Sequence, residues 1–210
     1  MINKRNQILK MTQLAILIAL VVVLQALGSA IKIGPLPMSL VLVPIVIGAC
    51  LLGVKAGALL GFTFGLVTMI MGILAIDGFS NILWNANPFW FVFLCLLKAT
   101  AAGFGSALVY KALGRAFNEK NKILQTVIAS VCAPIINTGI FVVGMLLFFF
   151  DTASALPSMF PDAFGAFENA FQLVFIGLAG LNFVGEFVIN LVLSPAIVRI
   201  VDIVNKKLKI

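Results

Sequence analysis

The sequence contains no histidine and few charged residues. Without histidine the chain lacks the commonest general base and metal ligand in proteins, and a Ser-His-Asp triad is impossible. Lys, Arg, Asp and Glu together make up 10% of the residues, whereas about a quarter is typical of a soluble domain. The three cysteines, Cys50, Cys95 and Cys132, all lie inside apolar runs, which favours neither a disulfide framework nor a metal site. The composition argues against a hydrolytic enzyme, and we expect no cofactor.

Apolar residues are abundant instead, at 62% of the 210 residues, which indicates an all-α integral membrane protein. The first apolar stretch ends with the small residues Gly28, Ser29 and Ala30, as a signal peptide would. Its apolar part of about 18 residues is too long for a typical signal peptide, so we expect a retained helix. The sequence predicts one domain, residues 1–210, with six transmembrane helices at about 11–30, 38–52, 56–76, 89–113, 123–150 and 169–201.

The positions of the basic residues predict the orientation of these helices. All Lys and Arg residues except Lys32 and Lys98 lie near the two termini or in the second and fourth loops. Because Lys and Arg accumulate in cytoplasmic loops, both termini are expected in the cytoplasm. The same distribution explains the net charge of +7 without a nucleic-acid partner.

Two further patterns concern packing and loops. Glycines recur every fourth residue at Gly57, Gly61 and Gly65, a spacing that lets another helix approach closely. Residues 77–88 and 151–168 are expected to be loops that close over a binding site on the outer side.

Four polar residues lie near the middle of predicted membrane helices, where a charged group is costly and usually functional. One interpretation is structural: Lys98 pairs with Glu186 and holds the fourth helix against the sixth, with little net effect on stability. The other is that these residues line a ligand cavity that is largely apolar with a few convergent polar groups. The candidate ligand-binding residues are Lys98, Asn137, Asn182 and Glu186 in the helices, with Trp84, Asn85 and Asn87 in the loop above them.

Three segments resemble a known family: AILIA at Ala15–Ala19, PIINTGIFVVG at Pro134–Gly144 and LNFVGEFVINLVLSPAIVRI at Leu181–Ile200. Together with the predicted six helices, they make the chain similar to the substrate-binding S component of an energy-coupling factor (ECF) vitamin transporter. The resemblance implies a binding subunit in the plasma membrane of a bacterium. It also implies that Ala15 and Ala19 pack against a transmembrane coupling (T) subunit.

The resemblance further implies that two cytoplasmic ATPases supply the energy, which agrees with the absence of a G-x-x-x-x-G-K-[ST] motif here. Lys98, as the sole cation deep in the helices, favours an anionic ligand, because a low dielectric strengthens its attraction for a carboxylate. Pantothenate would fit, with its amide and hydroxyls near Asn137, Asn182 and Asn87. Folate would need more aromatic surface. Riboflavin, lipoate, cobalamin and queuosine precursors remain alternatives.

Two other classes of protein compete with this interpretation. A small ion-coupled secondary transporter could use Glu186 as its proton or sodium site, although the chain is short and shows no inverted repeat. An intramembrane enzyme or a structural subunit is a third class, but we find no recognisable nucleophile, base or metal set.

Overall fold

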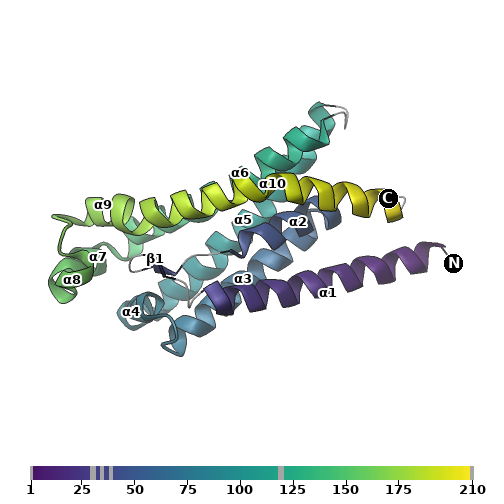
Figure 1. Cartoon of the computed structure of the whole chain (residues 1–210). Coiled ribbons are helices and arrows are strands. Elements are labelled where there is room, and N and C mark those ends of the chain that lie inside the picture. The colour runs from purple at the N-terminus through teal and green to yellow at the C-terminus, as the bar shows by residue number, and fades with distance from the viewer. Residues whose placement is uncertain (1, 29–31, 34–35, 38–39, 118–120, 209–210) are drawn as a thin grey trace.

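The computed structural model describes residues 2–28, 32–33, 36–37, 40–117 and 121–208. The chain forms a bundle of long helices that run up and down, and α1 begins at the end of the molecule where α10 finishes (Figure 1). In the described part, five helical segments are long and apolar enough to cross a membrane. They comprise α1 (Ile2–Gly28), α3 (Val54–Ile73), α5 (Pro88–Ala116), α6 (Lys122–Phe148) and a run formed by α9 (Ala170–Gln172), η1 (Leu173–Gly180) and α10 (Leu181–Leu208).

The second predicted span is shorter than expected. Helix α2 (Leu42–Leu52) has 11 residues, so it is about 16 Å long at 1.5 Å per residue. Two short antiparallel strands, β1 (Lys32–Ile33) and β2 (Leu36–Pro37), precede it. Pro44 lies in the first turn of α2, where its missing N–H needs no partner, so this proline leaves the helix continuous.

The two segments expected to be loops contain helices. Residues 78–86 form α4 (Gly78–Ala86), which begins where the Asp77 side chain accepts the Ser80 backbone N–H at 3.3 Å. Residues 150–164 form α7 (Phe150–Met159) and α8 (Pro161–Phe164). Proline suits the first position of a helix because its φ angle is already helical. The acidic cap of α4 and the proline at the first position of α8 therefore help to make helices of sequence that reads as loop.

The glycine stripe packs α3 directly against α5. A β-carbon built on Gly57 would lie 2.5 Å from the carbonyl oxygen of Gly103, and one on Gly61 would collide with the carbonyl of Ala99. Gly65 meets the backbone of α5 in the same way. The predicted close approach is confirmed, and it fixes the position of α5, which carries Lys98.

Buried apolar side chains form two clusters, one toward each end of the bundle. Along α5, Cys95 belongs to one cluster and Ala99 to the other, so that Lys98 lies at the boundary. On α6, Asn137 falls in the same way between Ala133 and Met145. The polar residues of several helices thus meet at one level, between two apolar layers.

Candidate functional site

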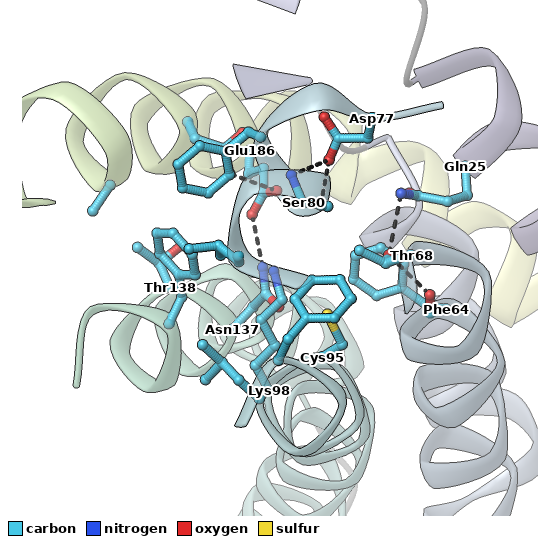
Figure 2. Close-up of a pocket in the computed structure, with 17 residues that line it drawn as sticks. Gln25, Phe64, Thr68, Asp77, Ser80, Cys95, Lys98, Asn137, Thr138 and Glu186 are labelled. Carbon is cyan, nitrogen blue, oxygen red and sulfur yellow. Dashed lines mark hydrogen bonds between the residues drawn. The ribbon is translucent and has the colours of Figure 1, made fainter. Parts of the chain in front are cut away.

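A pocket lies at this level, between α1, α3, α4, α5, α6 and the run from η1 to α10 (Figure 2). Its volume is about 80 Å³. Four of the residues predicted for ligand binding line it together, namely Lys98, Asn137, Asn182 and Glu186. Residues on three different helices, from Lys98 to Glu186, therefore converge on one cavity.

The carboxylate of Glu186 is buried, with 1% of the residue exposed. It accepts hydrogen bonds from Asn182 Nδ2 at 3.2 Å and from Asn137 Nδ2 at 3.4 Å. The Asn190 side chain, one turn further along α10, donates to the backbone carbonyl of Glu186 at 2.8 Å. The predicted polar face of α10 is thus present, and its bond to Asn137 joins α10 to α6.

Lys98 does not pair with Glu186. Within the described chain, no ion pair with an N···O distance of 4.0 Å or less involves Lys98. The ammonium nitrogen lies 5.1 Å from the centre of the Phe141 ring, a distance at which the ring face attracts a cation. The direct ion pair of the structural interpretation is absent between these two described residues, and Lys98 acts on Glu186 only at longer range.

The pocket also contains polar residues that the sequence did not single out. Asp77 accepts hydrogen bonds from both the backbone N–H and the hydroxyl of Ser80 at the start of α4. Gln25, on α1, donates to the Thr68 hydroxyl at 3.2 Å, and Figure 2 shows this pair on the opposite side of the pocket from Asn137. Ser, Thr and Gln are common enough in membrane helices that their positions alone carried no signal. Asp77, at the edge of an apolar run, did offer one: an Asp followed by helix-compatible sequence is a helix N-cap.

Two buried polar atoms in the pocket have no hydrogen-bond partner. They are Oδ1 of Asn137 and the hydroxyl of Thr138, on residues that are 3% and 8% exposed. Both residues lie on α6 and line the pocket. Buried polar groups without partners are rare in native proteins, and each calls for an explanation.

The three predicted residues in and beside α4 lie outside the described lining of this pocket. Asn85 is exposed and donates to Asn81. Asn87 caps α5, where its side chain accepts the Trp90 N–H at 3.4 Å. Trp84 packs edge to face on Phe91, with 6.2 Å between ring centres. These residues position α4 and the start of α5 above the pocket.

Ala15 and Ala19 both face outward on α1. Leu17 and Val21, on the other side of the helix, are buried against the bundle. The surface around the alanines is apolar, and Ile16 is 62% exposed. Among the described residues, no three His, Cys, Asp or Glu side chains are grouped closely enough to hold a metal ion.

Comparison with known proteins places the chain in a family. A model of the substrate-specific component of ECF transporters matches residues 9–198, which includes every residue of the pocket. No curated protein matches the sequence. Proteins of this family are multi-pass subunits of the plasma membrane that bind a small-molecule substrate for micronutrient uptake, and they are not enzymes. They work with a T subunit and ATPase subunits. Because the match covers nearly the whole chain, this protein belongs to the family of ECF transporter substrate-specific components.

Proposed function

We propose that the pocket binds an anionic, water-soluble vitamin or related micronutrient, and that pantothenate is the best candidate. The observation that carries this proposal is Lys98: its ammonium group lines the pocket and has no carboxylate within ion-pair distance in the described chain. A cation in an apolar setting attracts an anion far more strongly than it would in water. The carboxylate of a ligand would supply the negative partner that the Lys98 ammonium lacks.

The remaining polar residues suit the rest of such a ligand. Asn182 and Asn137 present amide groups, and pantothenate offers an amide and two hydroxyls for them. Trp84, Asn85 and Asn87 would contribute from the outer side by holding α4 over the bound molecule. The arrangement of a mostly apolar wall with a few convergent polar groups is typical of small-molecule sites.

The pocket is too small to hold a vitamin unless one of its walls moves. Pockets for drug-sized ligands have volumes of roughly 300–1,000 Å³, and this one has about 80 Å³. A vitamin would therefore require the pocket to widen. Helix α4 is short, and its buried residues Phe79, Ser80 and Leu83 line the pocket. We propose that α4 moves outward to admit the ligand and returns to exclude water.

For transport we propose a complex with one T subunit and two cytoplasmic ATPases, with residues 1–210 forming a single membrane domain. The exposed face of α1 that carries Ala15 and Ala19 is the proposed contact with the T subunit, because small residues let a second helix approach closely.

In the proposed membrane topology, α2 and the strands before it complete a sixth crossing, and both termini lie in the cytoplasm with the basic residues Lys55, Arg115 and Arg199.

The test combines chemistry and transport. Mass spectrometry of small molecules that copurify with the detergent-solubilised protein identifies its ligand, and isothermal titration with pantothenate measures the proposed one directly. Uptake into cells should require the ATPases and survive an uncoupler of the proton gradient. Uptake that stops with the uncoupler and continues without the ATPases would instead support a secondary transporter with Glu186 as its ion site.

A further inference from the structure

The pocket contains more acidic than basic side chains, and this bears on the kind of ligand that it can hold. Its lining includes one ammonium, that of Lys98, and two carboxylates, those of Asp77 and Glu186. In Figure 2, Asp77 lies on the opposite side of the pocket from Lys98. An anion placed among these groups would meet one attractive charge and two repulsive ones, unless other parts of the ligand offset the repulsion.

The two unpaired polar atoms of the pocket indicate which other groups the ligand would carry. Oδ1 of Asn137 is the carbonyl oxygen of the side-chain amide and can only accept a hydrogen bond, while Nδ2 of the same amide donates to Glu186 at 3.4 Å. The Thr138 hydroxyl is also unpaired. It differs in this from Thr68 and Thr126, whose hydroxyls donate to the carbonyl four residues earlier at 3.0 and 2.9 Å. Both residues line the pocket, so a ligand bound there is the candidate partner for their unpaired atoms.

We propose that the ligand is bipolar: it presents an anionic group to Lys98 and a separate hydroxyl donor to the side-chain carbonyl oxygen of Asn137, beside Thr138 and Glu186. This inference rests on the proposed function and narrows its substrate class. A molecule that has only the anionic group leaves buried acceptors unpaired, which is how a polar site rejects a close analogue. A molecule that has only donors leaves Lys98 unpaired.

The first arm of the test varies the probe. Pantothenate has both poles, whereas its analogue with both hydroxyls replaced by hydrogen keeps only the carboxylate and the amide. We expect the analogue to bind the purified protein at least tenfold more weakly by isothermal titration, and pantothenol, which lacks the carboxylate, to bind weakly as well. Equal binding of pantothenate and the dideoxy analogue would overturn the donor pole while leaving the proposed function intact. Failure of pantothenate to bind would contradict the proposed ligand.

The second arm varies the protein and needs no ligand. Because the Thr138 hydroxyl has no partner, Thr138→Val should leave the melting temperature of the ligand-free protein unchanged or raise it. Thr126→Val is the matched control on the same helix: it removes a formed hydrogen bond, lowers the melting temperature and leaves ligand binding unchanged. If Thr138→Val is as destabilising as Thr126→Val, the hydroxyl is used within the protein and the inference is wrong.

The two arms combine in a thermodynamic cycle, in which the wild-type protein and Thr138→Val are each titrated with pantothenate and with its dideoxy analogue. For pantothenate, Thr138→Val should weaken binding roughly 5-fold to 150-fold, the range for a lost hydrogen bond in a buried site. For the dideoxy analogue the same substitution should have a smaller effect, because the missing hydroxyls cannot use Thr138. Thr138→Ser, which restores a hydroxyl, should recover most of the affinity for pantothenate. Equal losses for both probes would show that Thr138 does not contact the donor pole.

Discussion

The Lys98 ammonium faces the Phe141 ring at 5.1 Å and makes no ion pair with Glu186, although both charged residues line the same pocket. The cation on α5 and the carboxylate on α10 thus lie apart in the pocket and interact only at longer range. Phe141 offers the cation only its ring face, and Glu186 already has two amide donors. This separation makes the contribution of Lys98 to ligand binding measurable by itself.

Replacing Lys98 by methionine should therefore weaken binding of pantothenate by about 1.5 to 3 kcal/mol, the worth of a hydrogen bond to a charged group. The free protein should not lose the 3 to 5 kcal/mol, approximately, that a broken buried ion pair costs. Titration and thermal unfolding give the two values. Lys111→Met, at an exposed position on the same helix, is the control and should change neither.

The double variant Lys98→Met, Glu186→Gln separates the two interpretations of this pair. If Lys98 binds the ligand, removing the charge of Glu186 as well does not restore affinity. Recovery of both thermal stability and affinity in the double variant would show that the two residues form a structural pair, and the inference of an anionic ligand would then be lost.

The outward face of α1 predicts a split between binding and transport. In the variant Ala15→Leu, Ala19→Leu, two larger side chains would hold a partner helix away, so uptake should be abolished while the isolated protein still binds pantothenate. Ala196→Leu enlarges another exposed alanine, on α10, and should leave uptake intact. Loss of binding by the purified double variant would mean that these alanines serve internal packing.

The contact between α3 and α5 predicts a contrast between two glycines. Gly61→Ala places a β-carbon against the carbonyl of Ala99 and should lower the free energy of unfolding by about 1 to 3 kcal/mol. At Gly139, on α6, an added β-carbon meets no atom within 4 Å, so Gly139→Ala should be neutral or stabilise by up to about 1 kcal/mol. Thermal unfolding in detergent compares them. Equal effects would mean that the close approach of α3 and α5 does not decide stability.

Ligand binding should slow amide hydrogen exchange in α4. Its backbone covers the pocket, and a bound molecule would hold it closed. Exchange measured with and without pantothenate should differ at residues 79–85 and remain the same near the start of α1, at residues 4–11. Unchanged exchange in α4 at saturating pantothenate would show that the entrance lies elsewhere.

The sequence predicted the helical membrane class and four residues of the pocket for one physical reason: a polar or charged group inside an apolar helix is expensive and conspicuous. Gln25 and Thr138 were not assigned to ligand binding, because uncharged polar side chains can satisfy themselves within their own helix. Asn87 was assigned to ligand binding, and the structure gives it a cap contact with Trp90. The order Asn-Pro at 87–88 could have indicated that role, since Asn favours the cap and Pro the position after it.

Other features depend on tertiary structure and carry little signal along the chain. The π-helical segment η1, residues 173–180, lies directly before Asn182 and Glu186. A π-helix winds more residues into each turn, so the direction of the side chains that follow it is set by how the segment packs. The four-residue spacing of Asn182, Glu186 and Asn190 predicted a shared face on α10. That this face meets Asn137 on α6 is seen only in the structure.

Helix α1 takes part in both proposed activities, because Gln25 reaches the pocket while Ala15 and Ala19 face outward. At 1.5 Å and 3.6 residues per turn, the two alanines lie about 15 and 9 Å along the axis from Gln25, and about a quarter and a third of a turn around it. A ligand that displaced Gln25 from Thr68 would remove a hydrogen bond that helps to set the rotation of α1 about its axis, leaving the packing of Leu17 and Val21 to hold the helix. A rotation of α1 would move Ala15 and Ala19 relative to the T subunit. Occupancy of the pocket could then be sensed at the exposed face of α1 that carries these two alanines.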